Sequence, residues 1–284
     1  MNTATLNQPP AAVQGSRLKR FFLSAPMRIV LGVLAVGLTT ALTFAAVKAL
    51  IPSPAARFVW PYLLVIALVL LVYIGFVRLT EKRPLNELSL TRAPLEFGAG
   101  LMIGGWAVAL TVGLLAATGS YRIVSFNPWS ASVAAPMAEM LFVGVLEEIA
   151  FRALIFRIIQ RSLGNWPALL ISGVIFSLAH LGGDISALGL ANTFLAGLML
   201  SAAWMITGRL WLCVGIHAAW NYVLGSIFSI AVSGHPAKGW IVGSLSGPEW
   251  VTGGVYGLEG SAWTALVLGA VFVALYQWRQ RAPV

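Results

Sequence analysis

The sequence predicts an all-α membrane protein built as a bundle of about eight transmembrane helices. Of the 284 residues, 59% are hydrophobic and only 10% are charged. Soluble domains carry about 25% charged residues, so this chain has too few charges for a surface in contact with water. Apolar segments long enough, or nearly so, to cross a bilayer recur along the chain. Each must be a helix, because lipid offers no partner for backbone N–H and C=O groups.

We expect a polar tail followed by a single bundle. Residues 1–26 are interpreted as a cytoplasmic N-terminal tail, because no clear small-residue cleavage site follows the first apolar run, as a signal peptide would require. Residues 27–284 form the transmembrane helical bundle. The fifth of its segments is short for a span and is expected to be tilted or partly re-entrant. The segments lie at about 27–49, 58–79, 97–117, 132–158, 166–181, 188–206, 210–230 and 261–278.

Basic residues are unevenly divided between the two sides of this bundle. The outer segments hold only a few basic residues, namely Lys48, Arg57, Arg122 and Lys238, whereas the inner loops hold many more. The positive-inside rule therefore favours both termini in the cytoplasm. The net charge of +9 is explained by these membrane flanks, so nucleic acid is not an expected partner. Short loops and composition favour a bacterial inner membrane. The inner loops hold Arg17, Lys19, Arg20, Arg28, Arg78, Lys82, Arg83, Arg92, Arg157, Arg161, Arg209, Arg279 and Arg281.

Three charged residues interrupt the fourth apolar segment. Glu147, Glu148 and Arg152 would each cost roughly 2.5–3.5 kcal/mol at the bilayer centre, so their presence indicates more than a membrane anchor. Glu148 and Arg152 are four residues apart on one helix face, and we expect them to pair. Glu147 points about 100° away and is expected to be the freer carboxylate. An interhelical clamp with a purely structural role remains an alternative for this trio.

Polar side chains also occur in the fifth and seventh segments. His180 lies near the end of the fifth, where a lone histidine is often only an interfacial residue. His217 and Asn221 are four residues apart on one face of the seventh, which indicates a site more than an accident of packing. In the third segment, Gly100 and Gly104 form a small-xxx-small pattern suited to close helix packing. The Gly-, Ser- and Pro-rich loop 231–260 is compatible with a lid or a plain connection, and the connection is preferred.

Three motifs follow one another on these segments: Glu147-Glu148-Ile-Ala-Phe-Arg152, Phe176-Ser-Leu-Ala-His180 and His217-Ala-Ala-Trp-Asn221. This order resembles the CPBP family of intramembrane proteases, also called the CAAX protease, bacteriocin-processing or Abi family. The family's core would cover about residues 130–230. The resemblance implies an endopeptidase that acts on a membrane-associated peptide or protein within the lipid bilayer. Eukaryotic relatives cleave prenylated CAAX tails, which are not expected in a bacterium.

The resemblance also implies roles for the polar residues. Glu147 and His180 would activate a water molecule, while His217 and Asn221 would stabilise the oxyanion. Glu148 and Arg152 would fix the helix and the local charge. We predict that Glu147, His180, His217 and Asn221 converge in one cavity in the inner half or centre of the membrane.

Two alternatives to this scheme stay open. In a metalloprotease, zinc would be held by Glu147, His180 and His217, with water as the fourth ligand. The metal-free scheme is favoured, because no close-spaced histidine pair prebuilds a metal site. In a protein of a different class, a non-proteolytic membrane scaffold or a bacteriocin-immunity protein, the polar cluster would only hold the bundle together.

Overall fold

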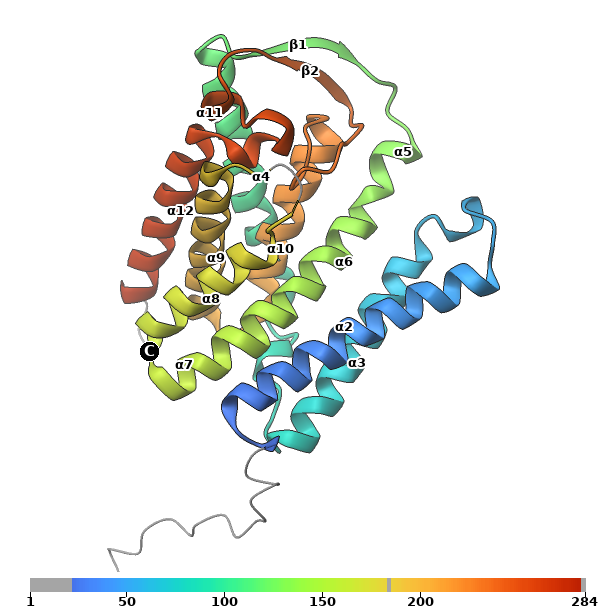
Figure 1. The fold of residues 1–284 in the computed structure, drawn as a ribbon, viewed down its shortest axis with the longest axis vertical. Helices are drawn as coiled ribbons and strands as arrows, with labels where there is room; N and C mark the ends of the chain where they lie inside the picture. The colour runs from blue at the N-terminus through green and yellow to red at the C-terminus, as the bar shows by residue number, and fades with distance from the viewer. Residues whose placement is uncertain (1–21, 183–184, 282–284) are drawn as a thin grey trace, which may run out of the picture.

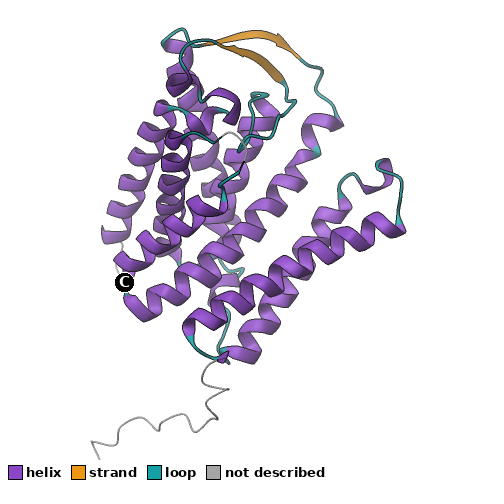
Figure 2. Ribbon diagram, viewed as in Figure 1, coloured by secondary structure: helices purple, strands orange, loops and turns teal. Residues whose placement is uncertain are grey.

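The computed structural model describes residues 22–182 and 185–281, and these ranges are mostly helical (Figure 1; Figure 2). The expected all-α architecture is confirmed. Most of the expected tail 1–26 lies outside the described residues. The helices are α2 (Ala25–Leu50), α3 (Trp60–Thr80), α4 (Ala93–Ala117), α5 (Ala131–Ala134), α6 (Pro136–Glu148), α7 (Arg157–Leu163), α8 (Asn165–Ala179), α9 (Ala187–Thr207), α10 (Leu210–Tyr222), α11 (Glu249–Thr252) and α12 (Ala262–Arg281).

Six helices among the described residues are long and apolar enough to cross a membrane. They are Ala25–Leu50, Ala55–Thr80, Ala93–Ala117, Ala187–Thr207, Leu210–Ile227 and Ala262–Arg281, and each coincides with an expected span. Several begin at a proline, as at Pro26, Pro61 and Pro94, where the missing N–H leaves no hydrogen bond unmade. α9 ends at Gly208, whose φ of 62° is readily adopted only without a side chain.

The fourth and fifth expected spans are less regular than the others. The fourth runs from α5 through α6 and α7, with a π-helical segment, Ile149–Phe156, between the last two. π-Helical turns are rare and often accompany functional sites. The fifth is α8, whose 15 residues extend only about 22 Å and cannot cross a bilayer alone. The expectation that this segment is short for a span is therefore correct.

Glycines bring α4 and α10 into close contact. A Cβ atom at Gly100 would lie 2.4 Å from the carbonyl oxygen of Leu212, and one at Gly104 would lie 2.3 Å from that of Ile216. Gly215 on α10 matches them, because its Cβ would lie 2.4 Å from the carbonyl oxygen of Phe97. Only helices without side chains at these positions can approach so closely. The small-xxx-small pattern thus fixes α10, the helix that carries His217 and Asn221.

A two-stranded antiparallel ribbon crosses one end of the bundle (Figure 1; Figure 2). It pairs β1 (Tyr121–Phe126) with β2 (Ile241–Leu245), and the register shifts between Ile123 and Ser125. The sequence analysis expected no strand here. β2 belongs to the long loop between α10 and α12, so the ribbon anchors this loop to the end of α4. The start of α2, the end of α3 and α7 lie toward the opposite end of the molecule (Figure 1).

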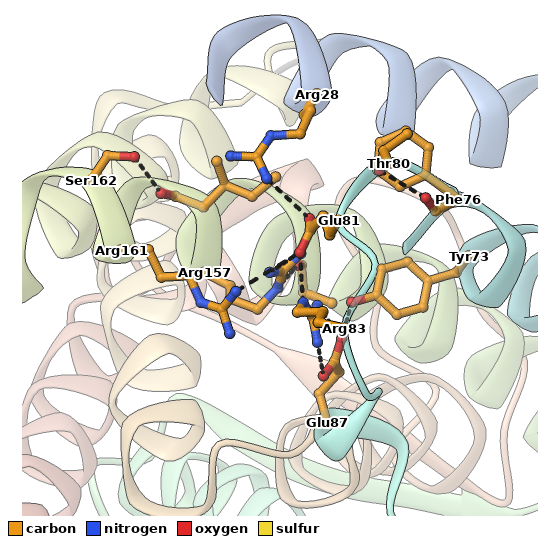
Figure 3. A network of polar contacts seen from close by, with 12 residues as sticks. Arg28, Tyr73, Phe76, Thr80, Glu81, Arg83, Glu87, Arg157, Arg161 and Ser162 are labelled. Atoms are coloured by element: carbon orange, nitrogen blue, oxygen red, sulfur yellow. Dashed lines mark hydrogen bonds and ion pairs between the residues drawn. The ribbon is translucent and has the colours of Figure 1, made fainter. Parts of the chain in front are cut away.

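Basic side chains at that opposite end gather around Glu81, just after α3 (Figure 3). Arg157 on α7 donates two hydrogen bonds of 2.7 Å to this carboxylate, Arg83 donates one of 2.6 Å, and Arg28 on α2 lies 3.8 Å away. Burial alone would raise the pKa of Glu81, but these hydrogen bonds and the arginine charges outweigh it and lower the pKa to about 2. The network therefore ties three helix ends together.

Candidate active site

The two adjacent glutamates of α6 have different surroundings. Glu148 is fully buried, as is Arg152, and Arg152 Nε lies 3.1 Å from Glu148 Oε2. Arg152 also donates a 3.1 Å hydrogen bond to Glu148 Oε1 and a 3.3 Å bond to the carbonyl of Gly197 on α9. The i,i+4 pair expected from the sequence is thus present. It also links α6 to α9, as an interhelical clamp would.

His217 lies between both carboxylates. Its Nδ1 is 2.8 Å from Glu148 Oε1, and its Nε2 is 3.9 Å from Glu147 Oε2. Since an ionised carboxylate only accepts hydrogen bonds, the bond to Glu148 places a proton on Nδ1 and turns Nε2 toward Glu147. The bond from His217 to Glu148 could not be predicted, because nothing in a single sequence gives the rotation of one helix against another.

His180 follows the last residue of α8, and its position there depends on where the helix ends. Its Nδ1 lies 2.8 Å from the carbonyl oxygen of Phe176, one turn earlier. A carbonyl oxygen can only accept, so Nδ1 carries a proton and Nε2 is directed elsewhere. That Nε2 lies 3.7 Å from Glu147 Oε2. The Phe176 ring packs against both His180 and Arg152, with the Arg152 guanidinium 4.5 Å from the ring centroid.

One cavity of about 600 Å³ collects the catalytic candidates. Glu147, His180, His217 and Asn221 all line it, so the structure brings together the four side chains that the sequence analysis expected to converge. Asn221 is buried, yet makes no side-chain hydrogen bond within residues 22–182 and 185–281. Glu148 and Arg152 are not among the residues that line the cavity. The full lining is Glu139, Met140, Val143, Glu147, Phe151, Ala179, His180, His217, Asn221, Val232, Ser233 and His235.

The cavity is closed on one side by the loop that follows α10. Ser233 and His235 come from this loop and also line a neighbouring cavity with Tyr256. His235 belongs to no motif in the sequence, and the sequence favours a plain connection for this loop. One side of the cavity is therefore turned toward the loop that carries β2, away from the basic network around Glu81. The expected depth, in the inner half or centre of the membrane, stays a prediction.

A further carboxylate near the site, Glu259, could not be predicted from the sequence. Glu259, in a single 3₁₀ turn before α12, lines a smaller cavity together with His180, His217 and Asn221. A glutamate in a Gly-rich loop gives no sequence signal of this kind, because the fold of the loop alone brings it to the site.

The donor set suits zinc in its chemistry, since it offers two imidazoles and one carboxylate. The spacing does not suit it. Ligands of a tetrahedral zinc ion with bonds of about 2.0–2.1 Å lie roughly 3.3 Å apart, whereas both imidazole nitrogens are farther than this from Glu147 Oε2, at 3.7 and 3.9 Å. Residues 22–182 and 185–281 contain no group of three or more His, Cys, Asp or Glu side chains that could hold a metal ion. As arranged, these residues do not fit the metal.

The fold and the site together define a polytopic membrane protein with ionisable side chains gathered in a cavity of its helical bundle. Residues 128–223 match the family described as Rce1-like, type II CAAX prenyl endopeptidase Rce1-like. The matched stretch contains all three motifs and confirms the resemblance to the CPBP family of CAAX proteases. This family supports a CAAX-type intramembrane protease in general. No curated protein matches the chain.

Proposed function

We propose that this chain is an intramembrane endopeptidase that hydrolyses a peptide bond in a membrane-associated peptide or small membrane protein. One observation carries the proposal. Glu147 Oε2 has no hydrogen-bond partner among the described residues, yet it lies near the Nε2 atoms of both His180 and His217 in a shared cavity. An unpaired polar atom in such a place is costly for the fold, and proton transfer requires a carboxylate that is not already engaged.

The nucleophile in this proposal is a water molecule held by Glu147 and His180. With Nδ1 of His180 donating to Phe176, Nε2 of the neutral ring accepts hydrogen bonds. The two acceptors, Glu147 Oε2 and His180 Nε2, are 3.7 Å apart, so one water can donate to both. Its oxygen lone pairs then point away from both residues, toward a peptide carbonyl in the cavity.

Hydrolysis then proceeds in two balanced steps. The water oxygen bonds to the carbonyl carbon while Glu147 takes one of its protons, which leaves a tetrahedral intermediate with a negatively charged oxygen. Glu147 returns that proton to the amide nitrogen as the C–N bond breaks, which gives an amine and a carboxylic acid. General acid–base catalysis of this kind contributes about 10²- to 10⁴-fold in rate.

His217 and Asn221 are the proposed donors to the oxyanion. Asn221 offers an amide N–H that no described residue binds, and His217 offers Nε2 when both of its ring nitrogens are protonated. The formal charges of Glu147, Glu148 and Arg152 sum to −1, so an imidazolium at His217 would neutralise the group. Removal of one such donor costs about 10²- to 10³-fold in other enzymes.

The substrate is proposed to reach the cavity from the side opposite the cytoplasm. The cavity is lined by Ser233 and His235 of the outer loop, while the basic network around Glu81 lies at the other end. With the basic end in the cytoplasm of a bacterial inner membrane, the substrate would be a peptide or precursor presented at the outer face.

The test is Glu147→Gln, which keeps the shape of the side chain and removes its ability to take a proton. Membrane proteomes of cells with the wild type and the variant are compared, and the stability of the purified variant is measured in detergent. We expect a membrane peptide or precursor to accumulate in variant cells while the protein remains folded. The control is Glu249→Gln, an exposed glutamate in the outer loop.

A scaffold or bacteriocin-immunity protein is the second candidate, since the Arg152 bond to Gly197 links α6 and α9 as a clamp would. A scaffold would tolerate Glu147→Gln or be destabilised by it. Proteomes that do not differ, from cells in which the variant is folded and expressed, would therefore favour this candidate over the protease.

A further inference from the structure

Glu259 is a partly buried carboxylate without a cationic partner in the described residues. Trp220 Nε1 on α10 donates a 3.2 Å hydrogen bond to Oε1. Ser233 donates to Oε2 twice, from its backbone N–H and from its hydroxyl, the latter at 3.2 Å. Burial raises the pKa of the Glu259 carboxyl above its usual value, although the hydrogen bonds from Ser233 and Trp220 and the nearby imidazole of His180 oppose the rise.

The residues that donate hydrogen bonds to Glu259 belong to two parts of the proposed active site. Trp220 immediately precedes Asn221, the proposed oxyanion donor, at the end of α10. Ser233 belongs to the loop segment that lines the catalytic cavity. A single carboxylate therefore joins the last turn of α10 to the segment that closes the site.

Glu259 and the catalytic candidates share a small cavity whose remaining lining is largely apolar. Its volume is about 50 Å³, and it is lined by Glu259, His180, His217 and Asn221. Because a water molecule needs about 10–15 Å³ of such space and two or more polar partners, the cavity has room for ordered water. Asn192 on α9 holds the turn from the other side, where it donates 2.8 Å hydrogen bonds to the carbonyls of Glu259 and Ser261.

We propose that Glu259 is a positioning residue of the active site, which holds Asn221 in place through Trp220 and closes the cavity through Ser233. This inference rests on the proposed peptidase function. With this role for Glu259, the long outer loop contributes to the active site and is more than a connection. An ionised carboxylate suits this place, because its two oxygens accept all three hydrogen bonds, whereas an amide would turn an NH₂ group toward one of the donors.

The first experiment compares Glu259→Gln and Glu259→Asp with the wild type in liposomes. The probe is the precursor that accumulates in Glu147→Gln cells. We expect Glu259→Gln to lower kcat about tenfold with KM nearly unchanged, because an oxyanion donor acts in the transition state. Glu259→Asp, which keeps the charge, should recover part of the loss. Glu249→Gln in the same loop should change neither constant.

A double-variant cycle separates positioning from mere stabilisation. If Glu259 acts through Asn221, then Glu259→Gln added to Asn221→Ala should cost no further activity. A full additional loss would overturn the inference, as would an unchanged kcat in a folded Glu259→Gln protein. If instead no precursor accumulates in cells with Glu147→Gln, the peptidase function itself fails. The two failures are therefore distinguishable.

Discussion

At the residue scale, His217 makes two neighbouring glutamates chemically unequal. Its Nδ1 lies 2.8 Å from Glu148 Oε1, to which Arg152 also donates a hydrogen bond, so Glu148 is held by an imidazole and a guanidinium. Glu147 receives no hydrogen bond on Oε2 from the described residues. Adjacent acids on one helix can thus take different roles. Arg152 neutralises Glu148 in the interior, while Glu147 is available to accept a proton.

Removal of metal ions is the prediction that belongs to this scale. Because the imidazole nitrogens lie farther from Glu147 than zinc ligands would, treatment of the purified protein with a strong chelator should leave the cleavage rate unchanged. The measurement is precursor cleavage before and after chelation, alongside the metal content of the protein. Inactivation that added zinc reverses would contradict the metal-free scheme. Glu147→Gln should stay inactive under every condition.

At the element scale, the position of α10 depends on helices that touch at glycines. Gly100, Gly104 and Gly215 allow the backbones of α4 and α10 to meet, and α10 carries His217 and Asn221. A shift of α10 by the width of one methyl group would therefore move two catalytic candidates relative to Glu147. A shift of this size has a large effect on the catalytic rate, because a misplacement of about 1 Å can lower the rate 10²-fold.

We predict that Gly104→Ala destabilises the protein by about 1–3 kcal/mol and lowers activity further. The new methyl group would lie 2.3 Å from the carbonyl oxygen of Ile216, and a backbone atom cannot move aside as a flexible side chain can. Thermal unfolding in detergent and precursor cleavage measure the two effects. Gly113→Ala on the same helix is the control, because its methyl group would meet nothing within 4 Å. Equal behaviour of both variants would argue against close packing at Gly104.

At the scale of the whole molecule, the basic network around Glu81 and the candidate catalytic cavity lie toward opposite ends. Glu81 and the arginines around it mark one end (Figure 3), and the ribbon with the outer loop marks the other (Figure 1). The positive-inside rule predicts that the first end lies in the cytoplasm. The catalytic cavity would then face the exterior, which limits its substrates to those that reach the outer face.

Cysteine labelling tests this orientation. The chain has a single cysteine, Cys213, which is buried and should not react. We expect Ser246→Cys, in the outer loop, to react with a membrane-impermeant maleimide in intact cells. Gln280→Cys, near the end of α12, should react only after permeabilisation. The reverse pattern would place the cavity on the cytoplasmic side and contradict the proposed direction of substrate access.

Features that follow from the spacing of residues along one helix could be predicted from the sequence, and the rotation of one helix against another could not. The Glu148–Arg152 pair follows from a spacing of four residues, and the contact at Gly104 follows from a small-residue pattern. The bond from His217 to Glu148 depends on how α10 is rotated against α6, which a single sequence does not encode locally. Glu259 reaches the site only because its loop folds back over α10.

The short α8 has a consequence for the lipid around it. Its 15 residues cover about 22 Å, whereas the hydrocarbon layer of a typical membrane is about 30 Å thick. The remaining depth is then filled by compressed acyl chains or by water that reaches toward His180. Compression of the bilayer costs the least free energy where the acyl chains are short. Peptidase activity should accordingly rise as the protein is moved from long-chain to short-chain phosphatidylcholine vesicles. A rate indifferent to acyl-chain length would mean that the protein itself fills the gap beneath α8.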